Sequence, residues 1–398
     1  MIPEGMRDVL PAEAAQLHAI EEILRGRFAA YGYLEVRTPS LEYAETLEAA
    51  DDDVIGGGYR VFDDQGHVLM LRTDMTVPLA RLAATRFEDK PLPLRFSYID
   101  SCFRPPGASR GQDGQFLQAG AELIGVAGAS ADAEVVALVC EILSASGLRD
   151  FTVSLGTVAF RNALVASLRL PPDQAEAALD ALAERDYPLL ESIVSNAGVD
   201  DDGRRALQKA LDLGGGDSAL SQARKLALGA GMEHAVDHLV SLRELLEDYG
   251  YADHVQFDFG LYPELTYYTG IIFEAFAPGV GLPIAQGGRY DDLLAAFEWP
   301  APAIGLAVAV DRLNMALEEA RVALPVRARP LSVAGGLERP QLVAELRRAG
   351  LDVASLPAGA PLTLPSLRHA DGDWILDAGT GREVRGSLRD VRRALGLS

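Results

Sequence analysis

The sequence predicts an α+β protein, in which an antiparallel sheet flanked by helices carries a helical insertion and is followed by a small α/β module. Strand-like runs at 60–63 and 68–72 flank a short turn. A further run ends at Phe103 and another begins at Gln115, and both pairs of runs have the pattern of antiparallel hairpins. From about 160 to 250, Ala, Leu, Glu and Arg dominate, and apolar residues recur at helical spacing.

Length, charge and cysteine content limit the class of protein. A chain of 398 residues with 48% hydrophobic content is long enough for two or three domains with real cores. The net charge of −22 opposes a broad nucleic-acid surface, because such binding depends on Lys and Arg that neutralise phosphates. Two cysteines, the lack of an apolar leader and the lack of any run near the ~20 residues of a membrane helix predict a cytoplasmic protein without a membrane partner.

Residues 1–325 are predicted to form one core, with an all-helical insertion of four or five helices at about 160–250, and residues 331–398 a separate module. The predicted core helices cover 13–30, 131–146 and 311–320, and the core strands cover 31–39, 94–103, 151–155, 255–259 and 304–310. Residues 265–276 are predicted to form a turn and a long strand. Residues 287–291 are predicted to form a glycine turn, followed by a helix that ends at Phe297. In the module, strands are predicted at 331–334, 351–356 and 374–376, and helices at 340–349 and 387–395.

Polar residues in apolar surroundings are the first candidates for a site. Gln118 and Glu122 lie among Phe, Leu, Ala and Ile, and buried polar groups need partners. Thr73 is suited to cap a helix with Asp74 at its positive end. Asp74 and Thr76 are equally placed to project into a pocket, so both interpretations stay open.

Three further features share a theme of anion binding. Arg104 follows the strand before the central loop, Arg312 opens a helix after a buried strand, and the glycine pair 287–288 lets a backbone approach another group closely. Two arginines at strand ends suit a phosphate. Each is a weak signal alone, because an arginine at a strand end is more often an ion-pair partner.

Two patterns have the spacing or composition of metal ligands. His234 and His238 lie four residues apart on one helical face, and residues 51–53 are three consecutive Asp. No third ligand accompanies the histidines, and adjacent carboxylates in a glycine-rich loop point in different directions. We therefore predict a solvated helix face, a solvated loop and no metal.

In combination, these stretches resemble the catalytic core of class II aminoacyl-tRNA synthetases, and of the histidyl enzyme in particular. YGYLEVRTP (31–39) is similar to motif 1, FR (103–104) with QFLQAGAELIG (115–125) to motif 2, and GLAVAVDRL (305–313) to motif 3; LTYYTGIIFEAF (265–276) and GGRYD (287–291) are similar to the histidine-specific segments. The resemblance covers about residues 2–320. It implies the class II fold and a homodimer contact through the helix and strand over 13–39. The alternative is that these two elements belong only to the core and make no subunit contact.

The departures from this family fall on the groups that handle ATP. Motif 2 of the family reads FRxE and continues into a loop with several arginines. Here the Glu position holds Pro106, and the loop arginines fall on Gly107, Gln112 and Gly114. The arginine of the family's RGLD segment falls on Pro263. Because proline and glycine have no side-chain donors for phosphate or adenine, we expect no catalytic residue, no ATP chemistry and no cofactor.

The amino-acid pocket, in contrast, is intact in the resemblance. Its matching positions are Asp74, Thr76, Gln118, Glu122, Tyr267 and Tyr268, and the remaining motif 2 arginine is Arg104. The family implies that the acidic, hydroxyl and amide groups surround the ligand's amino group and ring, and that the tyrosines form an aromatic wall. We expect Arg104 to contact the ligand's carboxylate, because no adenylate chemistry uses this arginine here. Buried charges of this kind suit a cationic ligand; the alternative is a hydrogen-bonded core network without a ligand.

A histidine pocket without its ATP loop, followed by a short tail, is similar to the regulatory subunits of ATP phosphoribosyltransferase, the first enzyme of histidine biosynthesis. This resemblance implies a non-catalytic chain that forms a homodimer, assembles with short-form catalytic subunits, supports their activity and binds free L-histidine for feedback inhibition. The alternatives are an active histidyl-tRNA synthetase, a tRNA-binding module and a stand-alone amino-acid-binding protein. The lost arginines oppose the first alternative, and the net charge opposes the second.

Overall fold

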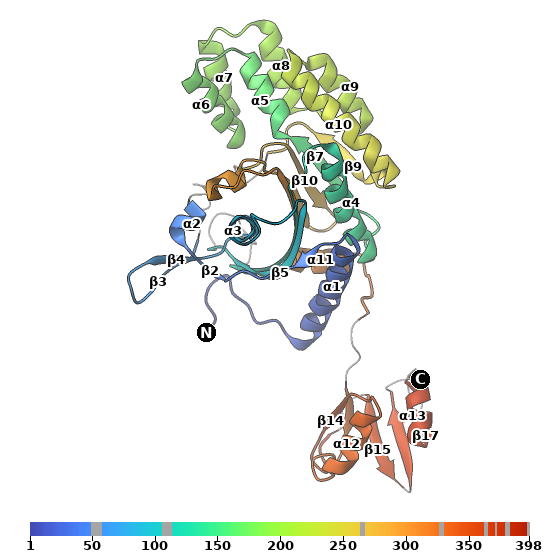
Figure 1. The fold of residues 1–398 in the computed structure, drawn as a ribbon. Helices are drawn as coiled ribbons and strands as arrows, with labels where there is room; N and C mark the ends of the chain where they lie inside the picture. The colour runs from blue at the N-terminus through green and yellow to red at the C-terminus, as the bar shows by residue number, and fades with distance from the viewer. Residues whose placement is uncertain are drawn as a thin grey trace. The chain divides into compact units, whose positions relative to one another are not determined.

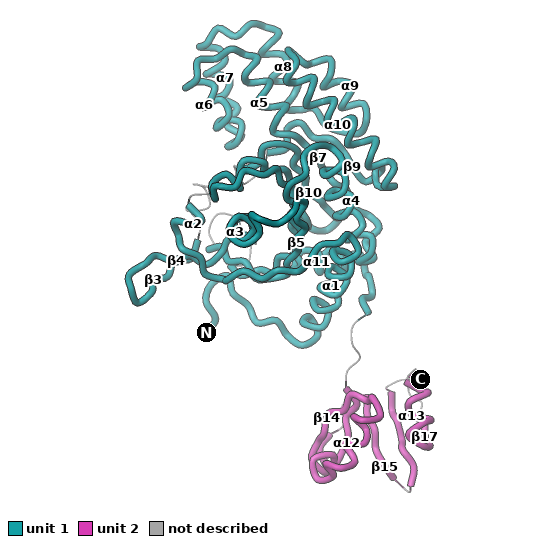
Figure 2. Tube along the Cα trace, viewed as in Figure 1, with its two compact units in different colours: residues 1–325 teal, residues 326–398 magenta. Residues whose placement is uncertain are grey.

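The computed structural model describes residues 1–48, 58–105, 114–262, 267–325, 330–361, 365–370, 372–378 and 383–395. Within these residues the chain divides into two compact units, 1–325 and 326–398 (Figure 2). Each unit has its own hydrophobic core. No helix in the described part of the chain is both long enough and apolar enough to cross a membrane.

A nine-stranded sheet forms the centre of unit 1 (Figure 1). In spatial order its strands are β1 (Leu34–Glu35), β5 (Leu94–Phe103), β6 (Gln115–Ile124), β12 (Ala303–Ala309), β11 (Ala285–Arg289), β10 (Ile271–Phe276), β7 (Thr152–Thr157), β9 (Val255–Asp258) and β8 (Gly214–Gly215). Every neighbouring pair from β5 to β7 is antiparallel, whereas β1 is parallel to β5 and β9 is parallel to β7. The predicted antiparallel sheet flanked by helices is confirmed.

One face of this sheet is covered by helices. α1 (Pro11–Ala30), α4 (Ala129–Ala145) and α11 (Val310–Glu319) pack on it and on one another. Because successive side chains of a strand point to opposite faces, β6 directs Ala119, Ala121 and Leu123 into this core. Gln118 and Glu122 therefore lie on the opposite face, which we call the pocket face.

The pocket face is covered by smaller elements. α3 (Thr76–Arg86) and the 3₁₀ helix η3 (Leu293–Phe297) pack against each other there, in a second core that includes residues of β5. A three-stranded sheet follows the order β2 (Leu41–Tyr43), β4 (Val68–Leu71) and β3 (Arg60–Phe62), and α2 (Ala44–Glu48) packs on it. The antiparallel pairing of β3 with β4 confirms the hairpin predicted over 60–72.

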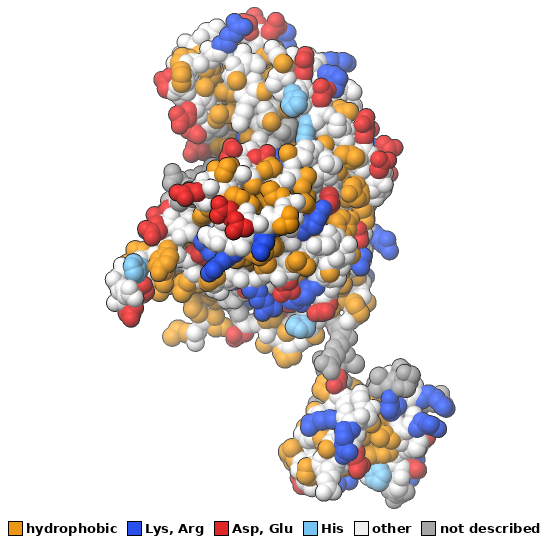
Figure 3. Space-filling model, in the orientation of Figure 1, with side chains coloured by type: hydrophobic (Ala, Val, Ile, Leu, Met, Phe, Trp, Pro, Cys, Tyr) orange, Lys and Arg blue, Asp and Glu red, His pale blue; other side chains and the backbone are white. Residues whose placement is uncertain are grey.

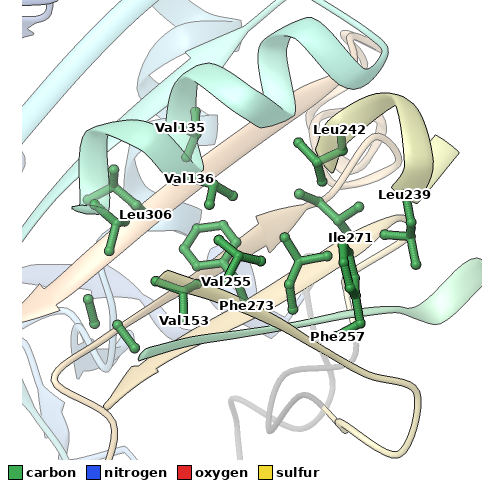
Figure 4. Packing of buried hydrophobic residues seen from close by; sticks show 14 of the residues in the cluster. Val135, Val136, Val153, Leu239, Leu242, Val255, Phe257, Ile271, Phe273 and Leu306 are labelled. Carbon is green, nitrogen blue, oxygen red and sulfur yellow. The ribbon is translucent and has the colours of Figure 1, made fainter. Parts of the chain in front are cut away.

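The helical insertion is residues 158–248. Its six helices are α5 (Val158–Ser167), α6 (Pro172–Ala183), α7 (Tyr187–Asn196), α8 (Asp201–Leu211), α9 (Asp217–Leu226) and α10 (Ala230–Asp248). The prediction of four or five helices is too low, and the segment is not entirely helical, because Gly214 and Gly215 form β8. α10 packs beside α4, where Leu239 and Leu242 join the main core (Figure 4).

Two local predictions near the pocket face are wrong. Residues 287–291 do not form a turn, because Gly287 and Gly288 lie within β11. A Cβ at Gly287 would lie 2.2 Å from the Gly305 carbonyl oxygen, so close strand packing requires glycine there. The strand predicted over 31–39 is reduced to the two residues of β1. The turn and strand predicted over 265–276, in contrast, agree with a turn at Tyr267 and with β10, which begins at Ile271.

Unit 2 is a five-stranded sheet with two helices. Its sheet order is β14 (Val353–Ser355), β13 (Leu331–Val333), β15 (Ser366–Ala370), β16 (Asp373–Asp377) and β17 (Glu383–Gly386), with α12 (Pro340–Arg348) and α13 (Leu388–Ala394). Strands β15 and β17 were not predicted, because both carry charged residues and few buried ones. β15 has two buried residues and β17 has none.

Charge is distributed unevenly between the units. Residues 326–398 carry eleven Arg against eight Asp or Glu, so the acidic excess of the chain lies in unit 1. Figure 3 shows acidic side chains over the visible face of unit 1 and many basic ones on unit 2. The argument from net charge against a nucleic-acid partner therefore applies to unit 1 alone.

Candidate functional site

The residues predicted for the site come together on the pocket face of unit 1. Six of the seven line one small cavity: Asp74, Thr76, Arg104, Gln118, Tyr267 and Tyr268. The seventh, Glu122, lies behind this lining and is bonded to Thr76. Strands β5 and β6, the start of α3 and the residues before β10 position these side chains, which are up to 194 residues apart in sequence.

Glu122 is the most deeply buried of these groups, with 1% of its surface exposed. The Thr76 hydroxyl donates a hydrogen bond to its Oε1 at 3.0 Å, and the Tyr290 hydroxyl donates one to its Oε2. Burial raises the pKa of Glu122 to about 8, although both hydroxyl donors act against this shift. At neutral pH the carboxyl is therefore mostly protonated, and a ligand with N–H donors or a positive charge favours its ionised form.

Two glycines create the space that these side chains occupy. A Cβ at Gly305 would lie 1.7 Å from Oε2 of Glu122, and a Cβ at Gly288 would lie 2.8 Å from the Tyr268 ring. Both glycines lie in strands, where they would ordinarily weaken the sheet. Their role is to let a carboxylate and an aromatic ring approach the backbone closely.

We expect Gly305→Ala to destabilise unit 1 by roughly 1–3 kcal/mol, as overpacking does in a filled interior. The added methyl group would displace the Glu122 carboxyl, which is fixed between two hydroxyls. Urea unfolding measures the change. Gly26→Ala is the control, because no atom lies within 4 Å of its Cβ and it lies in the middle of α1, where Ala should stabilise by ~0.5–1 kcal/mol. Equal stabilities for the two variants would contradict the assignment.

An aromatic wall closes one side of the cavity. The rings of Tyr267 and Tyr268 lie 4.9 Å apart, and Tyr290 meets Tyr267 edge-on at 5.8 Å. Burial raises the pKa of Tyr290 well above its usual value, so its hydroxyl remains a donor to Glu122. Sequence reasoning missed Tyr290, although it is the tyrosine of the GGRYD stretch, because that stretch was interpreted as a turn that leads into a helix.

Asp74 lies at the N-terminus of α3 and is 4% exposed. Its Oδ1 accepts a hydrogen bond from the Val77 N–H at 3.3 Å, so Asp74 takes the capping role that was predicted for Thr73. The carbonyl of Thr73 instead accepts a hydrogen bond from Nε of Arg104 at 3.1 Å. Asp74 thus caps the start of α3 and also lines the cavity.

Gln118 and Arg104 connect the polar cavity to a second one. Oε1 of Gln118 accepts a weak hydrogen bond from the Cys102 thiol at 3.3 Å. Both residues also line an adjoining cavity of about 110 Å³, together with Arg312. The polar cavity itself has about 10 Å³ of space, which is close to the volume of a single water probe. A ligand of amino-acid size therefore requires a movement of the cavity wall, an extension into the adjoining cavity, or both.

The predicted solvated face for the two histidines is correct for His234 alone. His234 is exposed, whereas Nε2 of His238 lies 2.6 Å from Oδ2 of the fully buried Asp132. Nε and Nη2 of Arg289 donate to Oδ1 of Asp132 at 2.8 and 2.5 Å. Among the described residues, no group of three His, Cys, Asp or Glu is arranged to hold a metal ion.

Several positions of the sequence argument lie outside the described residues. They are the loop positions 106, 107 and 112, the acidic run 51–53 and Pro263. Gly114 is described, and its surroundings are closed: a Cβ there would lie 2.9 Å from the Tyr59 hydroxyl and 3.2 Å from the Gly5 carbonyl oxygen. A long basic side chain at this position would require both neighbours to move.

Known proteins resemble this chain over most of its length. A sequence model of the histidyl-tRNA synthetase family matches residues 5–313. An ATP phosphoribosyltransferase regulatory subunit from Moorella thermoacetica is 38% identical over 397 residues, which cover 100% of this chain and 97% of that protein. The one from Desulforamulus reducens is 40% identical over 359 residues, covering 88% of each.

Solved structures show the same likeness. A Bacillus halodurans protein described as an ATP phosphoribosyltransferase regulatory subunit/histidyl-tRNA synthetase superposes with a TM-score of 0.81 at 32% identity, covering 92% of this chain and 94% of that one. Histidyl-tRNA synthetase from Nostoc superposes with a TM-score of 0.79 over 100% of this chain and 98% of its own, at 20% identity, which supports the fold alone. The chain therefore belongs to the family of ATP phosphoribosyltransferase regulatory subunits, built on the class II fold of histidyl-tRNA synthetase.

Proposed function

We propose that this chain is a non-catalytic subunit that binds free L-histidine in the pocket of unit 1 and thereby inhibits a short-form ATP phosphoribosyltransferase catalytic subunit. It forms a homodimer, assembles with that subunit and supports its activity when histidine is scarce. The observation that carries the proposal is the combination of a complete polar pocket with a sequence that lacks the arginines for ATP.

The chemistry of the pocket supports histidine as the ligand. Glu122 and Asp74 offer acidic groups to an ammonium and an imidazole, and Gln118 offers an amide beside them. Arg104 lines both cavities and could bind the carboxylate of the ligand through its guanidinium. Burial of a carboxylate without a nearby cation costs free energy, and a cationic ligand would offset this cost.

The absence of catalysis is supported by the positions that replace the ATP-binding arginines. Pro263, Gly107, Gln112 and Gly114 stand where the synthetases have arginines. The crowding around Gly114 also leaves no space there for a long side chain. Arg104 and Arg312 remain, and Nη1 of Arg312 donates to the Pro283 carbonyl at 2.9 Å.

Feedback inhibition then follows from linkage. Histidine shifts the assembly towards a state in which the partner's active site is less competent, and it does so only by its difference in affinity for the two states. Such coupling is typically ~1–3 kcal/mol. The same coupling acts in reverse, so a partner ligand that disfavours the inhibited state weakens histidine binding equally.

Reconstitution with a short-form catalytic subunit tests the proposal. We expect phosphoribosyl transfer to ATP to require or be raised by this chain, and to fall roughly 5- to 150-fold at saturating histidine. Glu122→Ala should still support activity while its histidine affinity, measured by calorimetry, falls about 10- to 100-fold, because a hydrogen bond to a charged group is lost.

Glu244→Ala on the exposed face of α10 is the matched control and should behave as the wild type. An unchanged partner activity would refute the regulatory role, and an unchanged affinity in Glu122→Ala would refute the site. Histidine-dependent exchange between ATP and pyrophosphate would instead identify an active synthetase.

A further inference from the structure

The pocket has one wall without regular secondary structure. This wall, here called the tyrosine segment, is residues 267–270, which include Tyr267 and Tyr268 and end where β10 begins. The rest of the lining lies in strands, in the first turn of α3, or within two residues of the end of such an element, as Asp74, Arg104 and Tyr290 do. The polar cavity holds only about 10 Å³, so a ligand that does not extend into the adjoining cavity must displace a wall. The tyrosine segment is the wall that no helix or strand of its own holds in place.

The helical insertion holds this segment through α5. The N–H of Val158, the first residue of α5, donates to the Gly270 carbonyl at 2.9 Å. One turn later, the Arg161 guanidinium lies 4.1 Å from the centre of the Tyr262 ring, close to the geometry of a cation–π contact. Burial lowers the pKa of Arg161, and its Nε has no hydrogen-bond partner within the described residues. The ring of Tyr262, which precedes the tyrosine segment in the sequence, is thus a close contact of the Arg161 guanidinium.

The helical insertion holds the same segment a second time through α10. His238 of α10 contacts the buried Asp132, and Asp132 binds the Arg289 guanidinium. The backbone carbonyl of Arg289 accepts hydrogen bonds from the N–H groups of Thr269 and Gly270, at 2.8 and 3.4 Å. The Thr269 hydroxyl in turn accepts from the Asp291 N–H at 3.0 Å. A continuous series of contacts therefore runs from α10 to the tyrosine segment.

We infer that the helical insertion positions the tyrosine segment of the pocket, with Arg161 and His238 as positioning residues. Neither residue lines the cavity, so each acts through its neighbour, Arg161 through Tyr262 and His238 through Asp132 and Arg289. Ligand binding that moves the tyrosine segment also strains both contacts, and by reciprocity a protein bound to the insertion changes ligand affinity. The identity of the ligand as histidine rests on the proposed function; the positioning does not.

Hydrogen exchange on the full-length unliganded protein tests the positioning directly. We expect Arg161→Met to speed exchange of the Thr269 and Gly270 N–H groups roughly 3- to 30-fold, the range expected for loss of a cation–π contact. Arg161→Lys, which keeps a cation over the ring, should restore most of the protection. His238→Ala should act in the same direction, and His238→Gln, which keeps an N–H donor for Asp132, should restore protection.

Two further variants separate positioning from general stability. Arg243→Met removes an arginine of α10 that pairs with Asp217 and Glu247 inside the insertion, so it should leave exchange at residues 269–270 unchanged. Tyr262→Leu removes the ring from the other side, and the double variant with Arg161→Met should be no worse than either single one. Unchanged exchange in Arg161→Met, or equally faster exchange along β6, would overturn the inference.

Calorimetry on the same variants distinguishes this inference from the proposed function. If the wild type binds histidine, Arg161→Met should weaken binding by a similar factor of roughly 3 to 30 while Arg243→Met does not. Histidine binding that is equal in both variants, with unchanged exchange, overturns the positioning and leaves the proposed function intact. A wild type that binds no histidine but shows the exchange effect refutes the ligand and supports the positioning.

Discussion

The titration of Glu122 by itself should cost unit 1 about 5 kcal/mol of stability as the pH rises from about 4.5 to about 8, and Glu122→Gln should lack this loss. Glu122 has a pKa of about 8 in the folded chain against 4.5 for an ordinary Glu, and burial is the main cause. The folded state therefore holds this proton more tightly than the unfolded state does. The resulting stabilisation is fully present below pH 4.5 and is lost as the pH rises through 8.

Urea unfolding at one-unit steps between pH 5 and pH 9 measures this effect. The slope due to Glu122 is at most about 1.4 kcal/mol per pH unit. Other groups also titrate in this range, so the informative quantity is the difference between wild type and Glu122→Gln at each pH. Gln keeps the size and one acceptor for Thr76 or Tyr290 but has no proton to lose. Parallel curves for the two proteins would show that Glu122 is ionised in the folded state already.

The main elements of the fold could be predicted because their signals are local. The strand predicted over 94–103 coincides with β5, and the predicted insertion begins within α5. Glycines mislead this reasoning, because a pair such as Gly287–Gly288 is typical of turns. Here those glycines lie in a strand and allow the close approach of Tyr268 and Gly305, which only the folded sheet brings near them.

The site could be predicted in its polar residues but not in its supports. Glu122 stands out because an acidic residue in an apolar strand needs partners, and the resemblance supplied the rest of the pocket. Nothing local marks Tyr290 as a donor to Glu122, or His238 as a partner of Asp132, which lies 106 residues earlier. Such contacts depend on sheet order and helix packing, so they cannot be predicted from the periodicity of the sequence.

The buried ion pair between Asp132 and Arg289, behind the pocket, should contribute strongly to the stability of unit 1. We expect Asp132→Ala to destabilise it by about 3–5 kcal/mol, because removal of one partner leaves a buried charge uncompensated. Asp132 is fully buried and Arg289 is 5% exposed. The lower end of the range is expected, since Nη1 of Arg289 keeps Asp291 at 2.9 Å. Urea unfolding at pH 7 measures the loss.

Asp202→Ala is the matched control for this substitution. Both residues lie in the first turn of a helix and pair with an arginine, but the Asp202 side chain is 76% exposed and its pair with Arg205 should contribute little, within ~0.5 kcal/mol. The double variant Asp132→Ala/Arg289→Met removes both charges and keeps an unbranched chain beside Gly270. It should be more stable than Asp132→Ala alone, because the cost of the single variant lies in the stranded guanidinium. A double variant no more stable than Asp132→Ala would contradict this expectation, because the loss would then not come from the stranded guanidinium.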